Sequence, residues 1–310
     1  MMNALSGKDL LSILDLTPES AGDLLDLADQ VKGTPRAFST ALSGKVMAMI
    51  FEKPSLRTRV TFESGMFSLG GMAIYLSQDQ VRMGDREPDY DVARNLTRWV
   101  QIIVARTYSH QTLLDLAQEA TIPVINALSD WEHPCQALAD FQTIRESFGK
   151  SKVTVTFVGD GNNVCHSLLL LGVMLGYRMR VACPKGYEPR HEIVRQAQSL
   201  AEASGGSVTI GHDPCALAKD SQVLYTDVWT SMGQEKEHEK RLRDFQGFQL
   251  NRELLALAAP EARVMHCLPA HRGEEITDDI IESEASVLYD QAENRLHSQK
   301  ALLLRVLGEV

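Results

Sequence analysis

The stretch Phe51-Glu52-Lys53-Pro54-Ser55-Leu56-Arg57-Thr58-Arg59 lies where an apolar run, Val46–Phe51, gives way to a helical pattern. A continuous apolar run of this length is typical of a strand buried on both faces. Pro54 disfavours the α region at Lys53, and Ser55 is a favoured N-cap, so a helix is predicted to begin at Leu56. Strand, turn and helix recur in this order along the chain, which predicts an α/β fold with parallel sheets.

The start of this helix also predicts an anion site. Backbone N–H groups near Leu56, Arg57 and Thr58 have no carbonyl partner within the helix and lie at the positive end of its dipole. Ser55 and Thr58 add hydroxyl donors. Arg57 and Arg59 are two positions apart and cannot share a direction, so one is expected to face the anion and the other to brace the structure. An ordinary Ser-capped helix with surface arginines is the alternative.

The order of elements predicts two doubly wound domains, each a parallel sheet flanked by helices. Gly149 and the polar residues after it mark the boundary, because a long predicted helix ends there and a new strand follows. The last predicted helix, from about Glu293, carries apolar residues suited to packing. Further strands of the first domain are expected at 72–76, 101–106 and 124–127. A mobile loop is expected at 78–89.

A glycine turn opens the second domain. The predicted strand 153–158 runs into Gly159-Asp160-Gly161-Asn162-Asn163 and then into an apolar helix. This order invites a dinucleotide-binding interpretation, but Val164 replaces the third glycine of that motif. The next predicted strand, 178–183, ends without an acidic residue for a ribose, so no bound NAD is expected.

Composition excludes several classes of function. The 310 residues carry a formal net charge of −10, which argues against nucleic acid as a partner. No apolar run approaches the roughly 20 residues of a membrane span, and residues 1–16 lack a signal-peptide layout, so no membrane association and a cytoplasmic location are expected. Five cysteines without C-x-x-C spacing argue against a disulfide framework or a structural zinc site.

His133 and Gln136 lie at the predicted start of a helix. Pro134 is favoured at the first helical position, which puts the His133 imidazole at the positive end of the dipole, where it resists protonation. A neutral imidazole suits polarising a carbonyl oxygen, and Gln136 can accept from an amide NH2 group. Arg106, at a strand end, is placed to bind phosphate and carbonyl oxygens. The alternatives are that His133 is only a structural helix cap and that Arg106 is a surface arginine.

Polar residues also follow the strands of the second domain. Asp227 ends an apolar strand and offers a carboxylate for an α-amino group, while Ser231 and Met232 offer a hydroxyl and backbone groups. Asn163 can serve the same amino-acid head group, because open α/β sheets bind ligands at the carboxyl ends of their strands. An ordinary strand-to-loop turn is the alternative.

Cys267 follows a strand ending at His266 and precedes Leu268-Pro269, where a cis peptide bond is expected. A nucleophile and a metal ligand are the tempting interpretations of this cysteine. Neighbours on a strand point to opposite faces, so His266, Cys267 and His271 are not expected to form a metal site. No metal and no cofactor are expected.

Four stretches together resemble the aspartate/ornithine carbamoyltransferase family. Residues 55–59 are similar to its carbamoyl-phosphate motif, and residues 133–136 to its H-P-x-Q motif. Residues 227–233 and 266–269 resemble the motifs of the ornithine branch. The resemblance covers nearly the whole chain, from about residue 10 to residue 307.

The resemblance implies direct attack of the δ-amine of L-ornithine on carbamoyl phosphate, giving L-citrulline and phosphate. It implies a carbamoyl-phosphate domain at 1–149, completed by a C-terminal helix at about 291–310, and an ornithine domain at 150–290. The residues implied to be catalytic are Arg57, Arg106, His133 and Cys267. Those implied to bind carbamoyl phosphate are Ser55, Leu56, Arg57, Thr58, Arg82, Arg106, His133, Pro134, Cys135, Gln136 and Arg295. Those implied to bind ornithine are Asn163, Asp227, Ser231, Met232, Cys267 and Leu268.

The chain departs from the family at Arg82, where relatives often carry a glutamine. In the family this loop reaches carbamoyl phosphate in a neighbouring subunit of a homotrimer, or of a higher assembly of trimers. Arg82 either makes the same contact or the loop is set differently. The residues are compatible with roles in arginine synthesis and in arginine breakdown.

Two kinds of alternative function are weighed against this expectation. A carbamoyltransferase could act on aspartate, putrescine or N-acetylornithine, although an aspartate site requires basic residues where this chain has Asp227. A non-catalytic metabolite-binding homologue should have lost a phosphate or carbonyl contact. Ser55, Arg57, Arg106 and His133 are all present.

Overall fold

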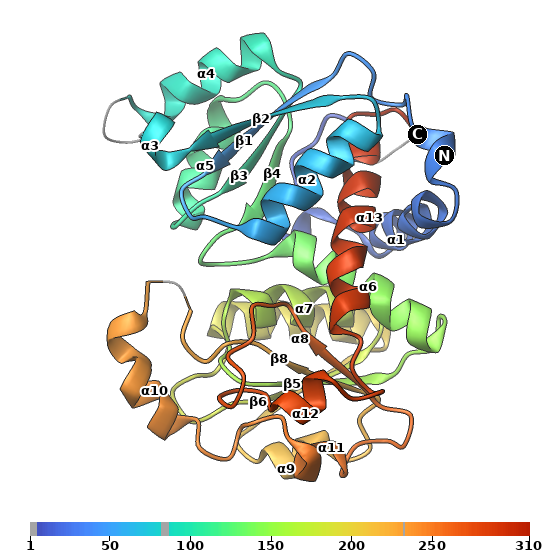
Figure 1. Cartoon of the computed structure of the whole chain (residues 1–310), viewed down its shortest axis with the longest axis vertical. Helices are drawn as coiled ribbons and strands as arrows, with labels where there is room; N and C mark the ends of the chain where they lie inside the picture. The colour runs from blue at the N-terminus through green and yellow to red at the C-terminus, as the bar shows by residue number, and fades with distance from the viewer. Residues whose placement is uncertain (1–4, 82–86, 232) are drawn as a thin grey trace. The chain divides into compact units, whose positions relative to one another are not determined.

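The computed structural model describes residues 5–81, 87–231 and 233–310, which form two compact units (Figure 1). The first unit comprises Met1–Gln142 and Glu293–Val310, and the second comprises Thr143–Ala292. The boundaries proposed from the sequence, after residue 149 and near residue 291, differ from these divisions. Two helices, α6 (Pro134–Phe148) and α13 (Leu288–Val306), run from one unit into the other, which accounts for the difference.

The first unit contains a parallel sheet in the order β2-β1-β3-β4. Its central strands are buried on both faces, as their continuous apolarity predicts. The strand order reverses between β1 and β3, and in open α/β sheets ligands bind at the carboxyl ends of strands at such a point. The strands are β1 (Val46–Phe51), β2 (Met72–Ser77), β3 (Ile102–Arg106) and β4 (Val124–Leu128).

Helices cover both faces of this sheet. Alternate residues of β1 and β3 pack against α4 (Asp89–Trp99) and α5 (His110–Glu119) in one apolar cluster. On the other face, Figure 1 shows α13 beside α1 (Pro18–Gly33) and α2 (Leu56–Ser68). The Lys32 Nζ of α1 donates to Asn294 Oδ1 of α13 at 2.9 Å. The expected return of the C-terminal helix to the first unit is therefore confirmed.

The second unit contains a parallel sheet in the order β7-β6-β5-β8-β9, which reverses between β5 and β8. The carboxyl ends of these two strands therefore lie next to each other at the switch point. The strands are β5 (Thr154–Val158), β6 (Arg178–Ala182), β7 (Ser207–Gly211), β8 (Val223–Thr226) and β9 (Arg263–His266). The helices are α7 (Asn163–Met174), α8 (His191–Ser204), α9 (Pro214–Ala218), α10 (His238–Asp244), α11 (Arg252–Leu255) and α12 (Asp278–Ile281).

Two elements differ from expectation, and short 3-10 turns complete the described chain. Part of the predicted loop at 78–89 forms one helical turn, α3 (Gln78–Val81), while residues 82–86 lie outside the described residues. The last helix begins at Leu288, earlier than predicted, because Leu288 is buried in the apolar cluster of the second unit. The short 3-10 turns are η1 (Ile13–Asp15), η2 (Pro35–Phe38) and η3 (Glu235–Glu237).

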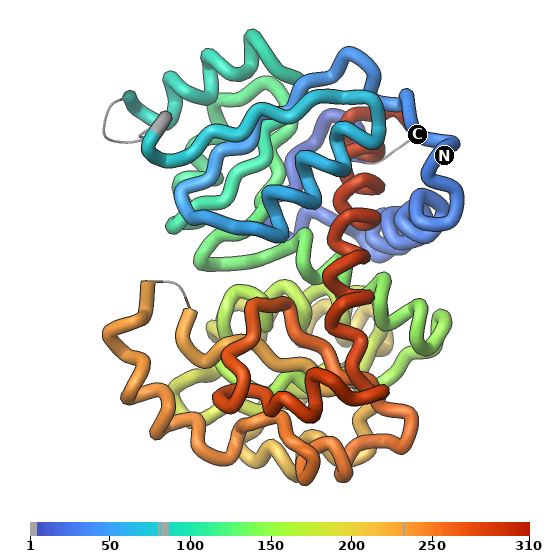
Figure 2. Tube along the Cα trace, in the orientation of Figure 1, coloured from blue at the N-terminus to red at the C-terminus, as the bar shows by residue number. Residues whose placement is uncertain are grey.

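The two ends of the described chain meet in the first unit. The Gly7 N–H donates to the Val306 carbonyl at 2.8 Å, and the trace in Figure 2 shows these segments side by side. Among the described residues, no helix combines the length and apolarity needed to cross a membrane.

Gly161, in the turn after β5, has no room for a side chain. A Cβ atom on Gly161 would lie 2.2 Å from the backbone nitrogen of Pro189, whereas a Cβ on Gly22, in α1, would meet nothing within 4 Å. We expect Gly161→Ala to lower the free energy of unfolding by about 1–3 kcal/mol, since backbone must move to accept the methyl group. Gly22→Ala is the matched control and should be neutral or stabilising. Equal unfolding midpoints for the two variants would contradict this account.

Candidate active site

The turn before α2, which the sequence predicts to bind phosphate, has the expected N-cap and helix start. Ser55 is the N-cap of α2, and its Oγ accepts from the Thr58 N–H at 3.3 Å. The turn follows the carboxyl end of β1 and so lies at the switch point of the first sheet. The Leu56 side chain is 74% exposed, so this residue offers its backbone N–H rather than its side chain to an anion.

The two arginines of this turn have different partners. The Arg59 guanidinium lies 3.7 Å from the centroid of the Tyr75 ring, and its Nε donates to Glu63 Oε1 at 3.1 Å. The contact with Tyr75 ties α2 to β2, and the bond to Glu63 lies within α2, so Arg59 braces the structure. Arg57 instead acts electrostatically on His133.

His133 immediately precedes Pro134, the first residue of α6, and is buried. Its pKa is held well below the usual value, chiefly by burial and then by the positive charges of Arg295, Arg106 and Arg57. The sequence argument named the helix dipole, and burial and three guanidinium groups act in the same direction. The ring is therefore neutral at pH 7, and one of its nitrogens carries a proton that it can donate.

Arg106 is the last residue of β3 and is buried. The alternative that it is a strand-end surface arginine is therefore wrong. Its Cα is paired with that of Phe51, the last residue of β1, so Arg106 ends its strand level with the start of the phosphate-binding turn. A guanidinium at that place suits an oxyanion.

The Arg295 guanidinium connects three helices of the first unit and is 2% exposed. Its Nη1 donates to Gln136 Oε1 on α6 at 2.6 Å, and its Nη2 donates to Thr58 Oγ1 on α2 at 3.1 Å. With its amide oriented to satisfy its neighbours, Gln299 accepts from Arg295 Nη2 at 2.9 Å and donates to Thr61 Oγ1 at 2.7 Å. Gln299 and Thr61 were missed by the sequence reasoning.

Cys135 is part of the H-P-x-Q motif, but its thiol points away from it. The Sγ donates to the Asn126 carbonyl of β4 at 3.4 Å, and burial raises the pKa of this thiol to about 12. Cys135 can therefore serve a ligand only through its backbone. Arg82 lies outside the described residues.

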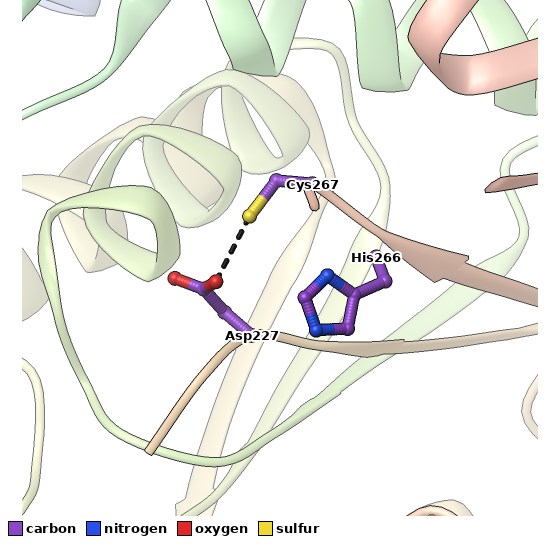
Figure 3. Close-up of side chains that lie close together, drawn as sticks. All are labelled: Asp227, His266 and Cys267. Atoms are coloured by element: carbon purple, nitrogen blue, oxygen red, sulfur yellow. Dashed lines mark hydrogen bonds between the residues drawn. The ribbon is translucent and has the colours of Figure 1, made fainter. Parts of the chain in front are cut away.

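The second unit gathers a polar cluster where β8 and β9 end. The Cys267 Sγ donates to Asp227 Oδ1 at 2.9 Å, and the Asn162 Nδ2 donates to Asp227 Oδ2 at 2.8 Å. Figure 3 shows the sulfur of Cys267 directed at the Asp227 carboxylate, with the His266 ring to one side. Asn162 was missed by the sequence reasoning, although an Asn at a helix start is a typical N-cap.

His266 is fixed by hydrogen bonds at both ring nitrogens. The Leu268 N–H donates to Nδ1 at 2.8 Å, so Nδ1 is the acceptor and Nε2 carries the proton, which it donates to Glu275 Oε1 at 2.9 Å. Both side chains are buried. His266 therefore has no free nitrogen for the Cys267 thiol, whose partner is Asp227.

The expectation that His266 and Cys267 diverge is wrong in part. Because β9 ends at His266, strand alternation does not govern Cys267, and one potential ligand atom each from Asp227, His266 and Cys267 lies within 4.8 Å of the others. His271 belongs to a separate group with Glu274 and Glu275. Hydrogen bonds already occupy the carboxylate, the thiol and both imidazole nitrogens of the first group.

The remaining predicted ornithine residues lie on the loops of the same unit. The Leu268–Pro269 peptide bond is cis, as expected, and Leu268 has a positive φ of 58°. Asn163 is the first residue of α7, and the Ser231 N–H donates to Gln234 Oε1 at 3.1 Å. Met232 lies outside the described residues.

Arg241 of α10 links these loops and had no signal in the sequence. Its Nη1 donates to Asp160 Oδ2 at 2.7 Å and to the Trp229 carbonyl at 2.8 Å, so it joins the glycine turn to the segment before Ser231. Burial tends to raise the pKa of Asp160 more than its pairing with Arg241 lowers it.

Comparison with known proteins identifies the class. The family model described as "Aspartate/ornithine carbamoyltransferase, carbamoyl-P binding domain" matches residues 8–146, and that described as "Aspartate/ornithine carbamoyltransferase, Asp/Orn binding domain" matches residues 151–306. A Synechocystis protein named ornithine carbamoyltransferase is 53% identical, covering 100% of this chain and 99% of its own length. One from Pyrococcus abyssi is 51% identical with the same coverage.

A solved structure gives the same result. The ornithine carbamoyltransferase from Pyrococcus furiosus has a TM-score of 0.96 and 50% identity, with 99% of each chain covered. The chain belongs to the aspartate/ornithine carbamoyltransferase family.

The depressed pKa of His133 predicts how stability depends on pH. Below pH 6.5 the unfolded chain binds a proton at His133 and the folded chain does not, so protonation favours unfolding until the folded pKa is reached. We expect the stability of the wild type relative to His133→Asn to fall below pH 6.5, by at most about 1.4 kcal/mol per pH unit. Chemical unfolding at fixed protein concentration between pH 5 and 8 measures this. A difference independent of pH would contradict a neutral His133.

Proposed function

We propose that this protein transfers the carbamoyl group of carbamoyl phosphate to the δ-amino group of L-ornithine. The neutral amine attacks the carbonyl carbon and forms a C–N bond, and the bond from carbon to the phosphate oxygen breaks. The amine nitrogen loses one proton, which the departing phosphate accepts, and L-citrulline and phosphate leave. The names of full-length relatives at 51–53% identity support this reaction.

The residues of the first unit suit carbamoyl phosphate. In this proposal Ser55, Thr58 and the backbone at Leu56 bind the phosphate group, with Arg57 and Arg106 compensating its charge. His133 donates to the carbonyl oxygen, which gains negative charge as the amine attacks. Its neutrality matters, because a neutral imidazole stabilises the oxyanion by hydrogen bonding without releasing a proton.

The carboxylate of Asp227 is the observation that carries the choice of ornithine. Asp227 directly follows β8 at the switch point of the second sheet, where its oxygens accept from Asn162 and Cys267. A carboxylate held there attracts an amino group and repels the second carboxylate of aspartate. Charge therefore favours ornithine over aspartate as the acceptor.

Cys267 is proposed to orient the δ-amine rather than to form a covalent intermediate. Its thiol donates to the Asp227 carboxylate, and the neighbouring imidazole of His266 is engaged at both nitrogens. His266 therefore does not serve the thiol as a base, and a protonated thiol is a poor nucleophile. An unhindered primary amine needs no such intermediate once it is neutral.

A homotrimer is the proposed assembly, as the family resemblance implies. Its support in this chain is an apolar surface on α2 and the edge strand β2, where Phe67 is 79% exposed and Met72 is 59% exposed. Exposed apolar side chains beside an unpaired strand edge are typical of an interface. Light scattering should then give three times the 34.4 kDa chain mass.

A cytoplasmic location and a role in amino-acid biosynthesis complete the proposal. All five cysteines are free, which suits a reducing compartment. A Pyrococcus furiosus relative, 51% identical over the whole chain, is named "Ornithine carbamoyltransferase, anabolic".

A substrate panel tests the function. With carbamoyl phosphate, a citrulline assay should give turnover with ornithine, and assays of phosphate release should give none with aspartate, putrescine or N-acetylornithine. Asp227→Ala should weaken ornithine binding tenfold or more, since a charged partner is lost, and leave carbamoyl phosphate binding nearly unchanged. Calorimetry separates the two affinities. Turnover with aspartate but not with ornithine would overturn the assignment.

The role of Cys267 can be tested separately. We expect Cys267→Ala to raise the ornithine KM and to retain measurable turnover, because the amine loses a contact but not a covalent partner. Mass spectrometry of wild-type enzyme quenched with carbamoyl phosphate alone should show no adduct. A carbamoyl thioester on Cys267, formed and consumed at the rate of turnover, would establish the covalent mechanism instead.

A further inference from the structure

Asp140 is a buried carboxylate that the proposed reaction does not yet use. It lies four residues after Gln136 on α6, so the two side chains share one face of the helix. Asp140 is 0% exposed and Gln136 is 2% exposed. The Gln136 Nε2 donates to Asp140 Oδ1 at 2.8 Å.

Arg295 holds the other end of the same amide. Its Nη1 donates to Gln136 Oε1 at 2.6 Å. A guanidinium only donates hydrogen bonds, and an ionised carboxylate only accepts them. The oxygen of Gln136 must therefore face Arg295 and its nitrogen must face Asp140, so the orientation of the amide is fixed from both sides.

An amide fixed in this way is selective for hydrogen-bond donors. The Gln136 oxygen has two lone pairs, of which Arg295 uses one. The second can accept from an N–H group and cannot bond to a methyl group. A carboxyl acceptor at the nitrogen end and a guanidinium donor at the oxygen end also polarise the amide, which strengthens its oxygen as an acceptor.

We propose that Asp140 is a specificity-determining residue that acts through Gln136. By holding the Gln136 nitrogen, Asp140 directs the oxygen toward the NH2 group of carbamoyl phosphate, so that the site selects a carbamoyl group over an acetyl group of the same size. The inference rests on the proposed function, in which Gln136 faces the carbamoyl group. Asp140 is a positioning residue and touches no substrate.

Two stable phosphonates provide the test, because they differ only in the group that Gln136 would recognise. Phosphonoacetamide carries an NH2 group where acetonylphosphonate carries a methyl group. Calorimetry on the full chain gives both dissociation constants, and their ratio measures selectivity. We expect the wild type to bind phosphonoacetamide at least tenfold more tightly, since the analogue lacking N–H leaves the second lone pair of the buried Gln136 oxygen without a donor.

Asp140→Leu keeps a similar volume and removes the acceptor. We expect it to weaken phosphonoacetamide binding about tenfold to a hundredfold and acetonylphosphonate binding by less than about threefold. Asp140→Asn can still accept from Gln136 and should retain most of the selectivity; it also covers the case in which the leucine variant fails to fold. In a Gln136→Leu background, Asp140→Leu should leave the ratio unchanged.

Gln142→Leu is the matched control, because Gln142 is also buried on α6 but bonds to Asp29 rather than to Gln136. It should leave the ratio as in the wild type. Equal weakening of both ligands by Asp140→Leu would show a merely structural role and overturn the inference. If Asp140→Leu weakens the binding of neither phosphonate, the inference is also overturned, while the proposed function stays intact. A wild type that binds neither phosphonate would overturn both the inference and the proposed function.

Discussion

The burial of one guanidinium constrains much of the first unit. Arg295 is almost fully buried, and a buried charge is tolerated only where several acceptors surround it. Its partners Thr58 and Gln136 come from α2 and α6, far earlier in the chain. The last helix must therefore pack on the first unit before Arg295 can contribute its positive charge to the predicted phosphate-binding turn and to the H-P-x-Q motif. The same guanidinium helps to keep His133 neutral.

Charge is divided between the two sheets. At the switch point of the first sheet the chain places Arg57 and Arg106, although the whole protein carries a formal charge of −10. At the end of β8 in the second sheet it places the carboxylate of Asp227. Both arrangements have the same cause, because the loops that follow parallel strands lie together at the carboxyl edge of the sheet. The signs of the local charges then suit a phosphate in one unit and an amine in the other.

The sequence was sufficient for features that depend on neighbouring residues. Pro54 and Ser55 determine where α2 begins, and the apolar run before them determines β1, so both were predicted closely. The cis bond before Pro269 was also predicted. The start of α13 was not, because Leu288 joins the helix by packing in a core that residues distant in sequence create.

The interactions that set the chemistry were harder to predict. The sequence showed the helix start beside His133, but not the burial or the three arginines that also lower its pKa. The contact of Asn162 with Asp227 was not expected for a similar reason, because only the fold shows that this amide reaches the carboxylate. Gln136 and Asp140 are four residues apart, which suggests that they share a helix face. The sequence does not show that Arg295 holds the other end of the Gln136 amide.

The arrangement around Cys267 explains why a cysteine beside a histidine need not be a nucleophile. Such pairs are catalytic when the imidazole accepts the thiol proton. Here the Leu268 N–H occupies Nδ1 of His266, and Glu275 accepts the proton on Nε2, so the imidazole has no lone pair for the thiol. The thiol donates to Asp227 instead, which places the sulfur against a carboxylate. Ionising the thiol would put two negative charges 2.9 Å apart, so the geometry favours direct attack by the amine over transfer through the sulfur.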